Sequence, residues 1–252
     1  SNSDMKDVLQ KINCKLIILA GDTYQIEAIE FGNWFELAKY FLKKEAWCEL
    51  ETPYRTKDQD LLLLWKKVRN LDNDITEHIV NCRYSTDLDE TIFEKKSKDE
   101  IILCLNYDGL YGINNINRFL QNNNENIPYK IGVWTYKIGD PILFNDSERF
   151  SPILYNNMKG TITCIEPMEQ GTYFSITEWD ASDVGLELLN PIHSGKSVVR
   201  FFVAKETNSD EDVQDENTIM PFQVSYAISI HKAQGLEYDS VKVIITEEVD
   251  EM

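Results

Sequence analysis

The spacing of hydrophobic residues changes along this chain, and the change limits the folds open to it. Near residue 15 and again near residue 100, apolar residues form short unbroken runs, at Lys15–Ala20 and Glu100–Asn106. Such runs are typical of strands buried on both faces of a parallel sheet. From about Ile131 onward, apolar and polar residues alternate instead, which favours short antiparallel strands joined by turns. The sequence therefore predicts an α/β fold that contains a separate β-rich part.

Helical spacing follows the unbroken apolar runs. In these segments apolar residues recur every three or four positions, as on the buried face of an amphipathic helix. The predicted helices are Phe31–Leu42, Gln59–Leu71 and Leu110–Asn122. Shorter apolar stretches predict strands at Trp47–Leu50, Val224–Ile228 and Val241–Thr246, with a short helical turn at Lys232–Gly235. Strands and helices that alternate in this way indicate a parallel sheet flanked by helices.

The alternating part is expected to form a small antiparallel barrel or sandwich. Its predicted strands lie within 132–136, 141–144, 160–165, 173–176 and 197–203. An acidic stretch, 207–217, follows them and has almost no apolar residues, which is typical of a solvated connection. We therefore expect three parts, namely residues 1–45, residues 46–130 together with 218–252, and a β-rich insertion at 131–217.

The balance of charges bears on the partners of the chain. Its 252 residues include 25 basic and 43 acidic ones, a net charge of −18. Composition alone argues against a general nucleic-acid binder, because neutralising phosphates requires clustered Lys and Arg. The five cysteines are odd in number and widely spaced, so we expect reduced thiols and no metal site. Since no apolar run approaches the roughly 18 residues of a membrane span, we expect a cytoplasmic protein without a membrane partner.

Two polar clusters follow predicted strands. Asp22 and Gln25 stand at the carboxyl end of the first apolar run, which is where open α/β sheets bind ligands. A capped turn explains that pair equally well. The second cluster, Ser225–Asp239, places a hydroxyl, an imidazole, a lysine, an amide, a glycine and a carboxylate in one loop after a strand. This density of polar groups indicates a binding or catalytic site.

The second cluster resembles a motif of the superfamily 1 helicases, of the UvrD/RecD-like kind. Ala227–Asp239 is similar over thirteen positions to the pattern A-x-T-x-H-K-x-Q-G-x-E-F-D of their second RecA-like domain, with Ser229 for Thr and Tyr238 for Phe. Other segments fall in family order. Gly21–Gln25 resembles the third motif of the family, Pro53–Arg55 the fourth, and Gly139–Phe144 with Leu154–Ile162 the β insertion of RecD-like members. The resemblance covers nearly the whole chain.

The resemblance implies a fold and a set of partners. Residues 1–45 would end a first RecA-like domain, 46–130 and 218–252 would form the second, and 131–217 would be a small SH3-like insertion. The full-length protein would use ATP and Mg²⁺ to move along single-stranded DNA and unwind duplex DNA. Its further partner would be the missing N-terminal RecA-like domain of the same chain.

The resemblance also implies roles for single residues. Gln25 would contact the γ-phosphate, Arg55 would act as an arginine finger, and Asp22 would shape the loop near a metal-bound water. Gly235 and Glu237 would approach the nucleotide. Ser229, His231 and Lys232 would contact the backbone of a single DNA strand.

Other interpretations remain open beside these roles. Arg55 is also explained as a surface arginine paired with carboxylates, and His231 as a turn histidine. For the chain as a whole, one alternative is a degenerate helicase-like module that serves as a protein-interaction platform. Another is a free-standing β-module binder with an incidental α/β flank.

One phosphate-loop-like segment is better explained as a turn. His193–Ser197 ends in Gly-Lys-Ser, but the phosphate-binding pattern requires glycine where Asn190 stands. A strand-like stretch follows it, so no helix N-terminus would face a phosphate. We therefore predict a hairpin turn here.

We predict that this chain alone binds ATP weakly or not at all and does not hydrolyse it. The physical reason is that no phosphate-binding loop or Asp-Glu metal motif stands ahead of Gly21 in the sequence. An ATPase assay of the purified chain, with and without single-stranded DNA, measures this. DNA-stimulated hydrolysis would contradict the prediction.

Overall fold

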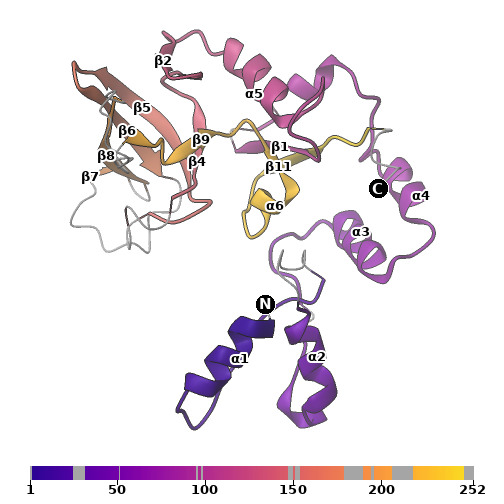
Figure 1. Ribbon diagram of the computed structural model, residues 1–252. Helices are drawn as coiled ribbons and strands as arrows, with labels where there is room; N and C mark the ends of the chain where they lie inside the picture. Colours follow the sequence, from indigo (N-terminus) through magenta and orange to yellow (C-terminus); the bar gives the residue numbers. More distant parts are fainter. Residues whose placement is uncertain are drawn as a thin grey trace. The chain divides into compact units, whose positions relative to one another are not determined.

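A computed structural model of the chain describes residues 2–24, 32–50, 52–94, 96–97, 99–146, 150, 154–178, 190–193, 196–205 and 218–246. The chain divides into two compact units, Ser1–Leu88 and Asp89–Met252, which are described separately below. Figure 1 labels their helices and strands. The predicted acidic connection at 207–217 lies outside the described residues. Within the described part of the chain, no helix has the length and apolar character needed to cross a membrane.

The described elements of the first unit are helical. They are α1 (Asn2–Lys11), α2 (Trp34–Phe41), a 3₁₀ turn (Lys44–Ala46), α3 (Gln59–Asn70) and α4 (Ile75–Asn81). The Asp58 side chain caps α3 by accepting hydrogen bonds from the amides of Asp60 and Leu61, at 3.0 and 3.2 Å. Leu71 ends α3 in the left-handed conformation. The predictions of helices over the α2 and α3 segments are confirmed.

The two strands predicted for the first unit are wrong. Lys15–Ala20 and Trp47–Leu50 have no regular secondary structure, and their side chains are exposed. A strand buried on both faces needs a neighbouring strand on each edge, and the described residues of this unit include no strand at all. None of its described side chains is buried. The apolar run Lys15–Ala20 therefore pairs with no strand among the described residues of this unit.

The second unit contains a three-stranded parallel sheet in the order β10-β1-β11. Its strands are β1 (Glu100–Cys104), β10 (Ala227–Ser229) and β11 (Ser240–Val243). Helix α5 (Ile113–Asn122) follows β1, and its residues Ile113 and Ile116 pack with Ile102 and Ala227 in one core cluster. The predicted strand and helix at 100–122 and the predicted strand near 241 are confirmed.

The remaining strands of the second unit are antiparallel. A two-stranded sheet joins β2 (Tyr129–Ile131) to β3 (Trp134–Tyr136), and a six-stranded sheet has the order β7-β8-β6-β5-β4-β9. The strands of the larger sheet are β4 (Pro141–Phe144), β5 (Lys159–Pro167), β6 (Gly171–Glu178), β7 (Asn190–His193), β8 (Lys196–Ala204) and β9 (Phe222–Val224). An antiparallel part was expected here and is confirmed, while its SH3-like character stays a prediction.

Two details of this sheet bear on the sequence predictions. His193 pairs with Lys196 between the antiparallel strands β7 and β8, as expected for the predicted hairpin. The single strand predicted at Val224–Ile228 is instead two strands in different sheets, because β9 pairs with β4 and β10 pairs with β1. The chain passes from one sheet to the other at Ser225 and Tyr226.

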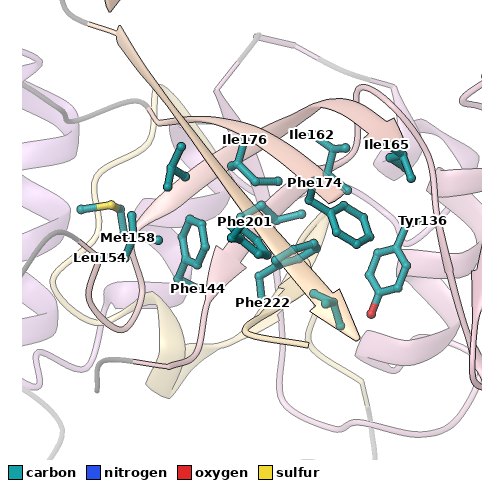
Figure 2. Packing of buried hydrophobic residues seen from close by; sticks show 13 residues of the cluster. Tyr136, Phe144, Leu154, Met158, Ile162, Ile165, Phe174, Ile176, Phe201 and Phe222 are labelled. Carbon is teal, nitrogen blue, oxygen red and sulfur yellow. The ribbon is translucent and has the colours of Figure 1, made fainter. Parts of the chain in front are cut away.

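Aromatic side chains fill the core of the larger antiparallel sheet, as Figure 2 shows. The ring of Phe174 lies edge-on to those of Tyr136 and Phe222, with centroids 5.7 and 5.3 Å apart. Phe144 contacts Phe222 in the same edge-on manner at 6.1 Å. Such contacts add to the free energy gained by burying the ring surface. The antiparallel part therefore has a core of its own.

A largely buried ion pair fastens β1 to β11. The Lys242 ammonium lies 2.9 Å from Glu100 Oε1, and the Ser240 hydroxyl donates to Glu100 Oε2 over 2.7 Å. Burial of the carboxyl opposes its ionisation. The hydrogen bonds from Lys242, Ser240 and the Lys96 amide outweigh that cost, so the pKa of Glu100 lies below its ordinary value.

We expect Glu100→Gln to lower the free energy of unfolding by about 1–3 kcal/mol at pH 7, because Lys242 loses its charged partner. The pKa is depressed in the folded state, so the contribution is full above the ordinary value of 4.5 and is lost as the pH falls through the folded pKa. Denaturant titrations of both proteins between pH 7 and pH 3 measure the difference. An exposed control, Glu125→Gln, should show no such dependence, and a pH-independent effect of Glu100→Gln would contradict the account.

Candidate functional site

The polar cluster predicted from the sequence begins on a buried strand of the second unit and continues into an exposed turn and loop. Strand β10 ends at Ser229, helix α6 (Ile230–Ala233) follows at once, and a loop leads into β11. Ser229 is only 8% exposed, and its Oγ accepts a hydrogen bond from the Lys232 amide at 3.3 Å. The segment therefore starts at the carboxyl end of a parallel strand, which is where open α/β sheets bind ligands.

His231 and Lys232 lie on the turn that Ser229 caps. His231 is exposed, so its imidazole is accessible to a ligand. Lys232 is half-buried, and its ammonium donates to the Gln223 side chain on β9. A cation held in this way keeps its charge at a fixed position. The structure thus places Ser229, His231 and Lys232 on one turn, and their contact with DNA stays a prediction.

Gly235 and Glu237 follow on the loop after α6. Gly235 has φ +83°, a left-handed conformation that strongly favours glycine, and a Cβ at this position would meet nothing within 4 Å. Glycine is therefore needed for the turn itself, and the space beside it is open. Glu237 is exposed, so its carboxylate can accept hydrogen bonds from a ligand.

A side-chain amide fixes the start of the segment. Asn117 on α5 donates to the Ala227 carbonyl at 2.9 Å and accepts from the Ala227 amide at 2.8 Å. These two bonds satisfy the backbone of β10 on the edge that faces away from β1. The sequence analysis did not single out Asn117, because the two residues are 110 positions apart and nothing local in the sequence connects them.

The site residues predicted for the first unit have less structural support. Gln25 lies outside the described residues. Asp22 is exposed, and its Oδ1 accepts from the Tyr24 amide at 3.0 Å. This bond forms an Asx turn, and the role of Asp22 near a metal-bound water stays a prediction. Arg55 is exposed on the segment before α3.

A cation that the sequence analysis missed lies beside the Asp22 turn. The Arg69 guanidinium, on α3, sits 4.2 Å from the centre of the Tyr24 ring and pairs with Glu49. A hydrogen bond with Tyr24, together with the charges of Glu49 and Asp22, raises the pKa of Arg69. A helix prediction could not find this contact, because it depends on how α3 packs against the turn.

Among the described residues, no group of three or more His, Cys, Asp or Glu side chains could hold a metal ion. All five cysteines are described and each is a free thiol. Burial raises the pKa of the Cys104 thiol to about 11, so that thiol is protonated at neutral pH. Neither observation tests the Mg²⁺ expected in the full-length protein, since that ion is commonly held by one carboxylate and the nucleotide phosphates.

Comparisons with known proteins give partial fold likenesses. No protein-family model matches the chain, and no curated protein matches it. The solved structures similar to it include Pif1 helicase from Bacteroides in complex with ADP-AlF3 and ssDNA, with 15% identity, a TM-score of 0.45, and coverage of 79% of this chain and 46% of that one. Bacteroides Pif1 bound to ssDNA gives 15% identity, a TM-score of 0.43, and coverage of 77% and 44%. The chain thus spans less than half the length of these helicases.

Proposed function

We propose that this chain is the C-terminal part of an ATP-dependent DNA helicase of superfamily 1, of the UvrD/RecD-like kind. It would couple ATP hydrolysis to movement along one DNA strand and to unwinding of the duplex in the cytoplasm. Residues 1–45 end the first RecA-like domain in this proposal. Residues 46–130 and 218–252 form the second, and 131–217 form the insertion, with an SH3-like character.

The arrangement of residues 227–239 carries the proposal. The thirteen-position resemblance falls on a segment that begins at the carboxyl end of a parallel strand, and the side chains of His231 and Glu237 are exposed there. The turn itself requires the left-handed Gly235, but it does not require an exposed imidazole or an exposed carboxylate. The location supports a ligand-binding role for these residues.

DNA contact in this proposal relies on a few polar groups. Ser229 uses its oxygen to accept from the Lys232 amide, which leaves its hydroxyl hydrogen to donate to a phosphate oxygen. His231 adds an exposed ring nitrogen and Lys232 a fixed positive charge. Contacts to phosphate and sugar hold a strand without reading its sequence. Such a site needs few cations, which is compatible with the net charge of −18.

The nucleotide fits the loop that follows. The open space beside Gly235 lets a ligand approach the backbone closely, and Glu237 can accept from a ribose hydroxyl. By the same resemblance, Arg55 would act as an arginine finger, Gln25 would contact the γ-phosphate, and Asp22 would shape the loop near a metal-bound water. When bound, ATP supplies the phosphoryl group whose transfer to water releases energy. The phosphates themselves would be held by the missing N-terminal RecA-like domain.

The apolar surface of the first unit supports contact with that missing domain. Large apolar side chains there are 74–91% exposed, among them Leu16, Ile18, Phe41, Leu50 and Tyr54. These side chains are available for contact with another protein surface. The same observation favours the second candidate, a degenerate helicase-like module that serves as a protein-interaction platform.

Substitution of Arg55 distinguishes these two functions. In the full-length protein we expect Arg55→Ala to lower kcat for ATP hydrolysis by about 10³-fold or more, because an arginine finger stabilises charge only in the transition state. DNA affinity should stay unchanged. Steady-state ATPase kinetics and a fluorescence anisotropy titration with single-stranded DNA measure the two quantities.

The matched control is Arg118→Ala, which removes an exposed arginine from α5 and should leave kcat unchanged. Intact ATPase activity in Arg55→Ala, together with lost binding of a protein partner, would favour the interaction platform and contradict the proposed enzyme.

A further inference from the structure

Two polar junctions join the antiparallel sheet to the two ends of the candidate segment. One lies at Tyr226, directly before β10, and the other lies at Glu237 and Tyr238, after α6. Both involve charged side chains of the antiparallel part, within the segments Gly139–Phe144 and Leu154–Ile162, to which no individual role has been given. The two groups are the buried carboxylate of Asp140 and the nearly buried ammonium of Lys159.

Asp140 forms the first junction. It stands in the turn before β4 and is fully buried. The Tyr226 hydroxyl donates to its Oδ1 at 2.9 Å, and the Lys137 amide donates to its Oδ2 at 2.8 Å. Burial and the Asp140 charge raise the pKa of Tyr226, so the phenol stays protonated and remains a donor.

The other partners of Asp140 come from the end of α5. Gln121 donates to Oδ2, and Asn124 donates to Oδ1 at 2.8 Å. A buried carboxylate is stable only when hydrogen bonds compensate for lost water. Four donors from three separate segments meet this need, so the position of Asp140 fixes the position of Tyr226 relative to both α5 and the sheet.

Lys159 forms the second junction. It begins β5, and its ammonium donates to the Glu237 carbonyl at 2.7 Å and to Asp99 Oδ2 at 2.9 Å. The same ammonium lies 4.3 Å from the centre of the Tyr238 ring. Its side chain is only 12% exposed. The Lys159 ammonium therefore holds the loop after α6 through two groups, the Glu237 carbonyl and the Tyr238 ring.

Apolar packing connects the two junctions. Leu143 on β4 packs against Ile101 and Ile228 of the parallel sheet, and Leu236 and Tyr238 lie against the same cluster. The Ser225 amide donates to the Pro141 carbonyl at 2.9 Å, next to Asp140. The antiparallel part thus contacts the segment at Tyr226, at Ile228 and Leu236, and at Glu237.

We propose that the antiparallel sheet is the frame that positions residues 226–239, with Asp140 and Lys159 as positioning residues. Asp140, through Tyr226, sets the contacts that Ser229 and His231 make with a DNA strand. Lys159 sets the positions of Gly235 and Glu237 against the nucleotide. The inference rests on the proposed function for its ligands, but its geometry belongs to this chain alone.

Two variants test the two ends separately. Tyr226→Phe removes one hydrogen bond to Asp140, and Lys159→Met removes the ammonium while keeping an unbranched apolar stem. The control is Arg200→Met on the same sheet. Arg200 pairs with Glu166 at 2.7 Å and lies 4.4 Å from the centre of the Tyr173 ring, so it loses the same kinds of contact away from the segment.

In the full-length protein we expect Tyr226→Phe to weaken single-stranded DNA binding about tenfold with the KM for ATP unchanged. We expect Lys159→Met to raise that KM about tenfold with DNA affinity unchanged. Arg200→Met should change neither. A merely structural role would move both quantities together, in proportion to the loss of thermal stability, and that result would overturn the proposal.

Hydrogen exchange in the 252-residue chain gives a readout that needs no ligand. Tyr226→Phe should speed exchange of the Ala227 amide, and Lys159→Met should speed exchange of the Asp239 and Ser240 amides, which donate to the Asp99 carbonyl. Unchanged exchange at these amides would overturn the frame. If the full-length wild type neither bound DNA nor hydrolysed ATP while these exchange changes appeared, the proposed function would fail and the frame would stand.

Discussion

The fold of the second unit depends on the pairing of β1 with two strands, β10 and β11, that follow it more than 120 residues later in the sequence. Ile102 is in register with Ala227 on one side and with Lys242 on the other, and both neighbours run parallel to β1. Parallel neighbours require a crossover, and here the crossover from β1 to β10 contains α5 and both antiparallel sheets. The parallel sheet forms only when the chain leaves the antiparallel sheet and enters β10 in the correct register. The hydrogen bonds of Asp140 with Tyr226 and of Asn117 with Ala227 hold the chain at this point.

The candidate segment therefore starts in the parallel sheet and is also held by contacts with the antiparallel part. Its first residues form a strand of the parallel sheet, and its side chains and backbone are held by the antiparallel one at Tyr226 and Glu237. A short loop on a surface is usually among the least stable parts of a protein. Here long-range hydrogen bonds hold the loop, which keeps polar groups in fixed positions for a ligand.

Sequence patterns predicted the elements that carry local signals and missed the contacts between distant residues. The helix at Gln59–Asn70 has helical spacing, an N-cap at Asp58 and a left-handed end at Leu71. The strand at Glu100–Cys104 is largely buried, as its apolar run indicates. Lys15–Ala20 has the same kind of run but no described neighbouring strand. The thirteen-position motif found the candidate segment. The segment Leu154–Ile162 contains Lys159, but its contact with the Glu237 carbonyl could not be found because the two residues are 78 positions apart.

The acidity of the chain has a physical place in this account. Several carboxylates are paired within the second unit, among them Asp99 with Lys159, Glu100 with Lys242 and Glu166 with Arg200. The candidate segment itself carries one lysine against Glu237 and Asp239. Long-range attraction to phosphates is therefore weak here, and the DNA binding that we propose relies on short-range hydrogen bonds.

The central claim is that residues 227–239 contact both DNA and nucleotide. Hydrogen exchange of the full-length protein, measured with single-stranded DNA alone and then with DNA and a non-hydrolysable ATP analogue, tests it directly. The account predicts that DNA slows exchange at residues 229–232 and that the nucleotide adds protection at residues 235–237. The claim would be contradicted if both ligands slowed exchange elsewhere in the protein and left the exchange of residues 227–239 unchanged.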